Sequence, residues 1–350
     1  MDIPRIEPGE IDGRYSEIID VRSPGEFVED RVPGAINLPV LSDVERAEVG
    51  TVYKQVSAFR ARRQGAALIT ENIAGYLKGH FADKEPGYRP LVYCWRGGQR
   101  SQSLATILAG VGWPVSLLDG GYKGYRKHVR EGIERLAANP ELDFRILAGL
   151  TGAGKTRLLR RMAAEGHQVL DLEKLANHRG SLLGREFPEP EQPTQKQFEN
   201  RLFEALKRLE EGRPIWVESE SNRIGELHVP GVFWGRMREA GVVELRVAVE
   251  FRAESLLMEY PHFVERPERL LATIEKLRAL VGSERVALWR EQVGSGDWKG
   301  FVIDILESHY DPAYLKSRER IFQVPDRVVE TSGVDEASTV EAVRAILEEG

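Results

Sequence analysis

The chain has very little cysteine, with Cys94 the single example in 350 residues. One cysteine excludes an intramolecular disulfide, and it excludes a zinc or iron–sulfur site built from several cysteines of the same chain. The seven histidines lack the short spacings typical of metal ligands, so we expect no metal ion held by protein side chains alone. Proteins made for oxidising compartments usually carry disulfides, and this composition therefore favours a reducing, cytoplasmic setting.

Long hydrophobic runs and a large excess of one charge are also lacking. No uninterrupted apolar stretch approaches the roughly 18 residues that a membrane-spanning helix needs, and the first residues lack the apolar core of a signal peptide. The 49 Lys and Arg against 55 Asp and Glu give a net charge of -6. This balance excludes a histone-like coat of positive charge, although a local basic patch could still bind nucleic acid.

The remaining composition is that of a globular α/β protein with two domains. Short apolar runs typical of buried strands alternate with helical patterns, which predicts parallel sheets covered by helices. Pro140 restricts the residue before it and should end a helix shortly before a new apolar strand begins. We therefore predict an N-terminal domain with a parallel sheet over residues 1–138 and a doubly wound parallel sheet over residues 139–350.

The predicted elements follow from these patterns. In the first domain they are strands at 17–21, 90–93 and 115–118 and a helix at 100–109. In the second domain they are strands at 144–148, 168–172, 214–218, 242–250 and 327–330, and helices at 155–165, 195–211 and 335–349.

Cys94 directly follows a predicted buried strand and opens a loop rich in glycine and arginine. Gly97 and Gly98 allow a tight curl that points backbone N–H groups inward, and the following helix adds its positive end. Such a cup stabilises a thiolate and binds an anion beside it, as group transfer to sulfur requires. The residues expected to bind the anion are Arg96, Gly97, Gly98, Arg100 and Ser101. The alternative is a buried structural cysteine.

A second anion-binding motif lies at residues 149–156, between a predicted strand and a predicted helix. Gly-Leu-Thr-Gly-Ala-Gly-Lys-Thr matches G-x-x-x-x-G-K-[ST] at every fixed position, which predicts a P-loop. The residues expected to bind a diphosphate are Gly149, Gly152, Ala153, Gly154, Lys155 and Thr156. The motif does not distinguish ATP from another diphosphate, and it leaves open whether Mg²⁺ accompanies the ligand.

Four further polar residues are candidates to support the phosphate site. Glu218 and Glu220 lie at the end of the strand predicted at 214–218, where NTPases place an acidic residue, or they could simply be solvated at a strand end. His178 and Arg179 could reach the phosphate or could stabilise their own loop.

The sequence upstream of Cys94 resembles the rhodanese signature. It reads Asp-Val-Arg-Ser-Pro-Gly-Glu-Phe at 20–27 and Asp-Arg-Val-Pro-Gly-Ala-Ile-Asn-Leu-Pro at 30–39. The spacing from Cys94 to Arg100 and Ser101 also fits cysteine phosphatases, some of which share that fold, so the fold alone does not fix the activity.

A rhodanese-like domain followed by a P-loop domain resembles the tRNA 2-selenouridine synthase family over essentially the whole chain. Further matching segments lie at 93–101, 171–181, 192–200, 216–225 and 310–314. At Glu220 and Asn222 the sequence departs slightly from the pattern of the family, too little to change the resemblance.

The resemblance implies a transferase that replaces the C2 sulfur of 2-thiouridine, at the wobble position of certain tRNAs, with selenium from selenophosphate. It implies an S-geranylated intermediate made from geranyl diphosphate, whose diphosphate the P-loop would hold. Cys94 would carry or relay the selenium, while Arg96, Arg100 and the helix N-terminus orient the selenophosphate. A selenophosphate synthase would supply that anion. The sequence does not indicate which tRNAs are chosen or whether the chain forms oligomers.

A tRNA substrate requires a basic surface with aromatic faces. Candidate segments are residues 59–63 and 122–128, together with Arg157, Arg160 and Arg161, and each could instead be a solvated helix face. Two rival functions remain. One is a rhodanese-type sulfurtransferase with an ATP-binding P-loop domain. The other is a non-catalytic, nucleotide-responsive binding module, which is disfavoured because a sensor needs no activated thiolate.

Overall fold

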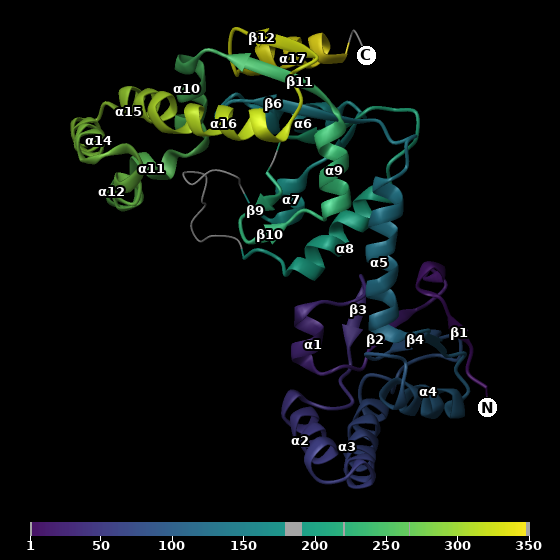
Figure 1. Cartoon of the computed structure of the whole chain (residues 1–350). Coiled ribbons are helices and arrows are strands. Elements are labelled where there is room, and N and C mark those ends of the chain that lie inside the picture. Colours follow the sequence, from purple (N-terminus) through teal and green to yellow (C-terminus); the bar gives the residue numbers. More distant parts are fainter. Residues whose placement is uncertain (1, 179–190, 220, 266, 348–350) are drawn as a thin grey trace. The chain divides into compact units, whose positions relative to one another are not determined.

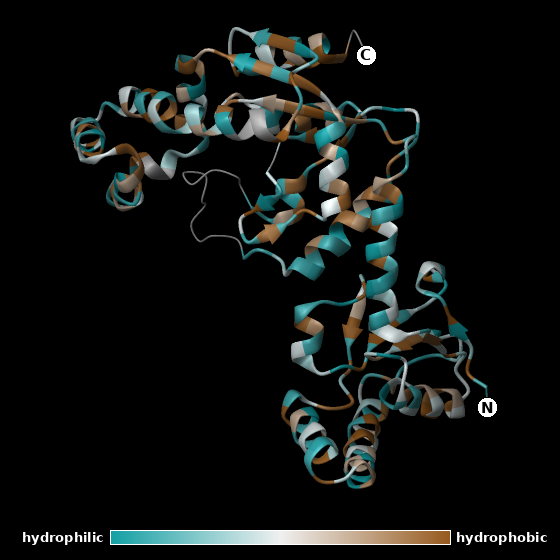
Figure 2. Cartoon of the chain, in the orientation of Figure 1, coloured by the Kyte–Doolittle hydropathy of each residue, from teal (hydrophilic) through white to brown (hydrophobic). Residues whose placement is uncertain are grey.

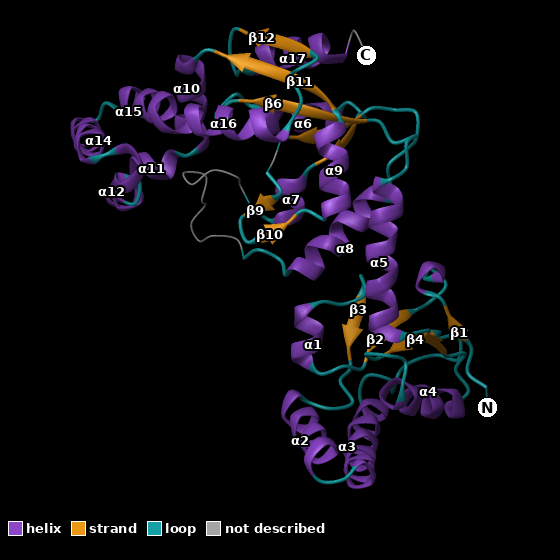
Figure 3. Cartoon of the chain, viewed as in Figure 1, coloured by secondary structure: helices purple, strands orange, loops and turns teal. Residues whose placement is uncertain are grey.

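A computed structural model of the chain describes residues 2–178, 191–219, 221–265 and 267–347, which form two compact units (Figures 1 and 3). Unit 1 consists of Met1–Gly132 and Thr194–Phe203, and unit 2 consists of Ile133–Pro193 and Glu204–Gly350. Within the described ranges, no helix combines the length and the apolar character that crossing a membrane would require.

Unit 1 is built on a five-stranded parallel sheet in the order β1-β5-β4-β2-β3. Its strands are Arg5–Ile6 (β1), Glu17–Asp20 (β2), Ala35–Asn37 (β3), Pro90–Tyr93 (β4) and Ser116–Leu118 (β5). Its helices are Pro24–Glu29 (α1), Asp43–Gln55 (α2), Ala58–Lys78 (α3), Gln99–Val111 (α4) and the first part of Gly121–Ala137 (α5). All four residues of the central strand β4 are buried. Cys94 therefore follows the middle of the sheet, at the carboxyl end where parallel sheets bind ligands.

Unit 2 contains a second five-stranded parallel sheet, in the order β12-β11-β6-β8-β7. Its strands are Phe144–Gly149 (β6), Gln168–Leu170 (β7), Ile215–Glu218 (β8), Gly241–Val247 (β11) and Arg327–Thr331 (β12). A short antiparallel pair is formed by Arg223–Ile224 (β9) and Leu227–His228 (β10). The associated helices are Lys155–Ala164 (α6), Leu172–Ala176 (α7), Gly231–Glu239 (α9) and Glu336–Leu347 (α17). Most of the helix Gln195–Leu206 (α8) belongs to unit 1.

Helices cover both faces of the sheet in unit 2. Phe144 of β6 packs against Phe233 of α9 with ring centroids 5.4 Å apart. Leu147, three residues along the same strand, points to the opposite face and belongs to the core shared with α6 and α17. Figure 2 shows hydrophobic residues gathered on the strands. The predicted α/β fold with two parallel sheets, the second of them doubly wound, is confirmed.

The region between β11 and β12 is a helical subdomain that the sequence patterns did not predict. It consists of Val249–Glu259 (α10), Pro261–Glu265 (α11), Pro267–Glu275 (α12), Arg278–Val281 (α13), Ser283–Ser295 (α14), Trp298–Ile305 (α15), a π-helical turn at Leu306–Tyr310 and Asp311–Ile321 (α16). Figure 1 shows most of these helices beside the sheet rather than over its faces. They have a core of their own, in which Trp289 and Phe301 pack edge to face.

Three predicted elements are too long by two residues or more. The strand expected at 168–172 ends at Leu170 as β7, and α7 begins at Leu172. The strand expected at 242–250 ends at Val247 as β11, and α10 begins at Val249. The alternating valines continue past the sheet because Val249 packs against the helical core instead. The helix expected at 195–211 ends at Leu206.

The segment Thr194–Phe203 is grouped with unit 1, whereas the division predicted after residue 138 places it with the P-loop domain. The physical reason is packing of this segment against the first domain. Asn200 hydrogen bonds to Asp30, and the Phe203 ring packs edge to face on His128 with centroids 5.3 Å apart.

Candidate functional site

Cys94 lies at the carboxyl end of β4 with only 3% of its surface exposed. Its Sγ accepts a hydrogen bond of 3.1 Å from the hydroxyl of Ser101, which is itself fully buried in the first turn of α4. Gly98 is the N-cap residue of this 13-residue helix. The structure therefore brings the thiol, a hydroxyl donor and the positive end of a helix together, as the sequence predicts.

The loop that begins at Cys94 is held by the backbone of residues 121–123. The N–H of Tyr122 donates to the Cys94 carbonyl at 2.8 Å, and the N–H of Lys123 donates to the Trp95 carbonyl at 2.9 Å. Gly121 has a φ of +57°, and a Cβ there would lie 2.4 Å from the Cys94 carbonyl oxygen and 2.5 Å from the Gly97 nitrogen. Only glycine fits this contact, so the shape of the Cys94 loop depends on it.

The two arginines predicted to bind an anion differ in their surroundings. Arg96 is exposed and has no ion-pair or hydrogen-bond partner among the residues that the structure describes. Arg100 instead donates to Glu26 Oε2 at 2.9 Å, and Glu26 also pairs with Arg46 at 3.0 Å. Burial raises the pKa of Glu26, but the two arginines outweigh it and hold that pKa below its usual value. Arg96 is thus the more available cation at the Cys94 loop.

A chain of buried hydrogen bonds connects the Cys94 loop to Asn200. Tyr122, whose N–H bonds the Cys94 carbonyl, donates its hydroxyl to Asp30 Oδ2 at 2.8 Å. Asn200 Nδ2 donates to Asp30 Oδ1 at 2.6 Å, and Asn200 Oδ1 accepts from Arg126 at 2.7 Å. Burial raises the pKa of Asp30, while Tyr122 and Arg126 partly offset that rise. Sequence reasoning gave Asn200 no role beyond its place in a matching segment.

In unit 2 the P-loop motif joins β6 to α6 as predicted. Gly152 and Gly154 adopt φ values of +80° and +82°, which glycine tolerates best. The Lys155 ammonium donates to the Gly149 carbonyl at 2.8 Å and lies 3.7 Å from Glu218 Oε1. The lysine therefore spans the loop from its first residue to the neighbouring strand.

Glu218 ends β8, the strand next to β6, and its side chain is buried beside the P-loop. The Thr156 hydroxyl donates to Glu218 Oε2 at 3.2 Å. Burial raises the pKa of Glu218, and the positive charge of Lys155 opposes that rise. Of the other candidate supporting residues, His178 lines the cavity at this site, whereas Arg179 and Glu220 lie outside the described residues.

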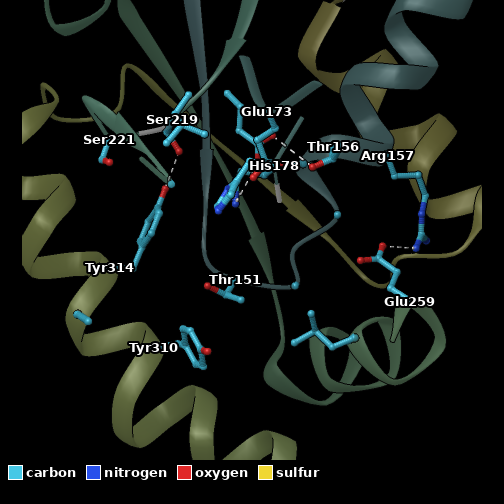
Figure 4. Close-up of a pocket in the computed structure, with 18 of the residues that line it drawn as sticks. Thr151, Thr156, Arg157, Glu173, His178, Ser219, Ser221, Glu259, Tyr310 and Tyr314 are labelled. Atoms are coloured by element: carbon cyan, nitrogen blue, oxygen red, sulfur yellow. Dashed lines mark hydrogen bonds and ion pairs between the residues drawn. The ribbon is translucent and has the colours of Figure 1, made fainter. Parts of the chain in front are cut away.

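A cavity of about 590 Å³ opens in front of the P-loop (Figure 4). Figure 4 shows Tyr310 and Tyr314 across this cavity from Thr156 and Arg157. A smaller apolar cavity of about 30 Å³ adjoins it and shares several lining residues with it. The shared residues are Thr151, Leu256, Tyr260 and Tyr310. The site therefore has a polar end at the P-loop and an apolar end among the helices of the subdomain. No group of metal-ligating side chains suited to hold an ion occurs in the described ranges.

Three residues of this site were missed by sequence reasoning. Tyr314 accepts a hydrogen bond of 3.1 Å from the Gly149 N–H. Arg252 is buried, donates to the Thr151 carbonyl at 3.1 Å, and makes two hydrogen bonds of 2.9 and 2.7 Å to Asp311. The only signal for Tyr314 and Asp311 was the family resemblance of segment 310–314, and Arg252 had none.

The candidate basic segments for tRNA binding differ in exposure and in ion pairing. In the segment 122–128, the two aromatic residues, Tyr122 and Tyr125, are buried and offer no ring face to solvent. Arg126 is buried as well. Arg157 pairs with Glu259 at 3.1 Å, and Arg161 pairs with Glu336 at 2.7 Å. Arg160 lines the P-loop cavity. The segment 59–63 remains exposed at four of its five positions.

Comparisons with known proteins match nearly the whole chain. Residues 142–335 match the family profile described as the tRNA 2-selenouridine synthase AAA domain, and residues 6–128 match the rhodanese-like domain. The tRNA 2-selenouridine synthase of Bdellovibrio bacteriovorus is 32% identical over 370 residues, covering 91% of this chain and 94% of that protein.

Two further matches are less extensive. The tRNA 2-selenouridine synthase of Nitrosomonas europaea is 36% identical over 250 residues, which cover 69% of this chain and 63% of that protein, less than two thirds of its length. A solved rhodanese-related protein from Thermoplasma volcanium is 16% identical with a TM-score of 0.24, covering 36% of this chain and 92% of that chain.

Proposed function

Because the chain belongs to the tRNA 2-selenouridine synthase family, we propose that it is a transferase that replaces the C2 sulfur of wobble 2-thiouridine in tRNA with selenium. The observation that carries this proposal is the cavity at the P-loop, which joins a phosphate-binding end to an apolar end. A prenyl diphosphate fits this combination, because its diphosphate is anionic and its hydrocarbon chain is apolar.

The first half-reaction uses geranyl diphosphate at this cavity. The sulfur of 2-thiouridine attacks C1 of the geranyl group, the C–S bond forms, and the C–O bond to the diphosphate breaks. Lys155 and the backbone N–H groups of the P-loop stabilise the charge that develops on the leaving diphosphate. The Thr156 hydroxyl and the Glu218 carboxylate are the oxygen groups that would hold a Mg²⁺ ion against that diphosphate.

The second half-reaction uses selenophosphate at the Cys94 loop. A C2–Se bond forms while the geranylthiolate leaves C2 with the electron pair of its C–S bond. Hydrolysis of the Se–P bond releases phosphate, so no oxidant or reductant is consumed. We assign the positioning of the selenium atom to Cys94, whose thiol would hold the selenophosphate beside C2 without forming an S–Se bond, because that bond would require an oxidant. We assign the orientation of the anion to Arg96, the N–H groups of Gly97 and Gly98, and the helix N-terminus. A selenophosphate synthase in the same cytoplasm would supply the anion.

The test is to incubate the purified chain with a 2-thiouridine anticodon stem-loop, geranyl diphosphate and selenophosphate, and to follow the mass of the nucleoside. We expect a gain of one geranyl group followed by conversion to 2-selenouridine. With Cys94→Ser, geranylated RNA should accumulate without selenium. With Lys155→Ala, geranylation should fall about 100- to 1000-fold, while RNA that is already geranylated should still take up selenium.

The matched control for the lysine is Lys299→Ala, which removes an exposed lysine paired with Glu254 in the same unit. It should leave both half-reactions unchanged. An unchanged nucleoside mass, accompanied by ATP hydrolysis, would instead favour a sulfurtransferase with an ATP-driven P-loop domain.

A further inference from the structure

The tip of the α2–α3 hairpin, residues 49–63, combines exposed aromatic and basic side chains. Figure 1 shows α2 and α3 side by side, and the two helices pack extensively against each other. We propose that this hairpin tip is a docking surface for tRNA. The identity of the RNA rests on the proposed function, whereas the location of the surface rests on the charges and exposure described below.

The positive charges at the hairpin tip have no acidic partners in the part of the chain that the structure describes. Lys54, Arg60 and Arg63 form no ion pair with any described residue, and Arg62 bonds only the Ala58 carbonyl of its own helix. The sequence contains no Asp or Glu from residue 49 to residue 70.

Several exposed arginines elsewhere in the molecule pair with a carboxylate. Examples of such pairs are Arg14–Asp12, Arg145–Asp143, Arg213–Glu210 and Arg278–Glu275. The hairpin tip instead concentrates its positive charges in a stretch of the chain without Asp or Glu, and such a local excess of positive charge favours a polyanionic ligand.

Large apolar side chains are exposed among these charges. Phe59 is 70% exposed, Tyr53 is 59% exposed and Val56 is 58% exposed. Phe59 lies three and four residues before Arg62 and Arg63, so helical spacing places its ring on the same face as both guanidinium groups. Aromatic rings beside unpaired arginines fit an RNA loop, because unstacked bases stack on the rings while phosphates pair with the arginines.

The base of the hairpin is fixed to the Cys94 site. Glu26 pairs with Arg46 of α2 and also with Arg100 in the helix that follows the Cys94 loop. Asp43, the first residue of α2, accepts a hydrogen bond of 3.0 Å from the Gly25 N–H. With 13 residues at 1.5 Å rise, α2 is about 20 Å long, so the tip and the Cys94 loop are joined by one short, anchored helix. An RNA held at the tip is therefore retained on the unit that carries Cys94.

The test measures binding of fluorescently labelled tRNA to the full chain by anisotropy across a range of KCl concentrations. The triple variant R60A/R62A/R63A should bind more weakly, and the slope of log affinity against log salt should fall in magnitude by about 2, as expected for three lost phosphate contacts. Phe59→Ala should weaken binding about 5- to 100-fold with an unchanged salt slope. Because alanine favours helix, circular dichroism should show both variants folded.

The matched control is R14A/R213A/R278A, which removes the same number of positive charges from exposed, paired positions. An equal loss of affinity and slope in this control would overturn the proposal, because net charge alone would explain the effect. Equal binding of a polyaspartate peptide and tRNA would also overturn it.

The docking surface and the proposed function can fail separately. If the wild-type chain modifies tRNA but the hairpin variants bind it as tightly as wild type, the docking surface is wrong and the function stands. If tRNA binding depends on the hairpin but no nucleoside mass changes with wild type, the function is wrong and the surface stands.

Discussion

The two glycine-rich loops of this chain occupy the same topological position in their sheets, but one is covered by neighbouring segments and the other faces a cavity. Each follows the central strand of a five-stranded parallel sheet and leads into a helix. In unit 1 the loop after β4 is hydrogen-bonded along residues 121–123 and encloses a buried thiol. In unit 2 the loop after β6 opens onto a cavity of about 590 Å³ walled by a helical subdomain. The segments that surround a loop, more than the loop itself, set the size of ligand that it can take.

The P-loop cavity is the open site, and removing the buried ion pair in its wall should give the largest loss of stability. In Arg252→Gln, the buried pair with Asp311 and the contact with the P-loop carbonyl of Thr151 are lost. Leaving Asp311 without its partner should lower the free energy of unfolding of unit 2 by about 3–5 kcal/mol. Urea denaturation measures this loss, and calorimetry with inorganic diphosphate should show weaker binding. Arg278→Gln, at an exposed pair, should change neither; an equal loss there would contradict the assignment.

The covered Cys94 loop is the closed site, and displacing this loop should give a slightly smaller loss of stability. Gly121→Ala combines a positive φ with a Cβ that would overlap the Cys94 carbonyl and the Gly97 nitrogen. We expect a loss of about 3 kcal/mol in unit 1, with faster alkylation of Cys94 by iodoacetamide because the displaced loop exposes the buried thiol. Gly34→Ala is the control, because its φ is +77° but nothing lies within 4 Å of the added methyl. If both variants lose equal stability, backbone strain alone accounts for the effect and the close contact does not matter.

A third test concerns the buried hydrogen bonds that connect the Cys94 loop to Asn200. Asn200→Ala leaves Asp30 and Arg126 each short of a buried hydrogen-bond partner. The free energy of unfolding of unit 1 should fall by about 1–3 kcal/mol, and the rate of Cys94 alkylation should change because Tyr122 loses its fixed acceptor geometry. Gln197→Ala, three residues earlier on the same helix, removes a less buried bond to the Val28 carbonyl and should have little effect. An unaltered alkylation rate in Asn200→Ala would show that the chain of bonds is purely structural.

The smallest expected effect depends on pH. The pKa of Glu26 is lowered in the folded chain, so its ion pairs with Arg100 and Arg46 stabilise the fold above its ordinary pKa of about 4.3. That stabilisation is lost as the pH falls through the lowered pKa. Glu26→Gln should therefore cost about 1 kcal/mol at pH 7, and the difference from wild type should shrink below about pH 4. A constant difference across that range would show that the charge of Glu26 is not what stabilises the site. Glu275→Gln is the control: Arg278 also lowers the pKa of Glu275, but this pair is exposed, so solvent screening should make its pH dependence smaller.

The sequence allowed much of both loops to be predicted, because their motifs are local. The P-loop, its lysine and the acidic residue that ends β8 all lie in or beside strands whose apolar patterns are clear. The walls of the open site could not be predicted in the same way. Tyr314 bonds a backbone group 165 positions earlier in the chain, and Arg252 bonds one 101 positions earlier. No local pattern encodes such distances.

The prediction was least accurate where one pattern could serve two structures. The alternating valines up to Val249 suggested a strand, yet the last of them enters a helix whose apolar face packs in the subdomain. Helix α8 was predicted, but the burial of Asn200 in unit 1 was not. A buried polar residue is invisible in a hydrophobicity pattern, because its partners come from elsewhere in the chain.

The placement of Thr194–Phe203 has a consequence for how the chain is made. The chain leaves unit 1 after Gly132, returns at Thr194 and leaves again after Phe203. A ribosome adds residues in order, at about 5–20 per second, so the P-loop at 149–156 is synthesised before Asn200 exists. Until Asn200 arrives, Asp30 and Arg126 each lack one of their buried hydrogen-bond partners, and a nascent chain that stalls near Gly132 cannot complete unit 1. Co-translational maturation of the Cys94 site therefore finishes only after the same chain has already acquired its P-loop.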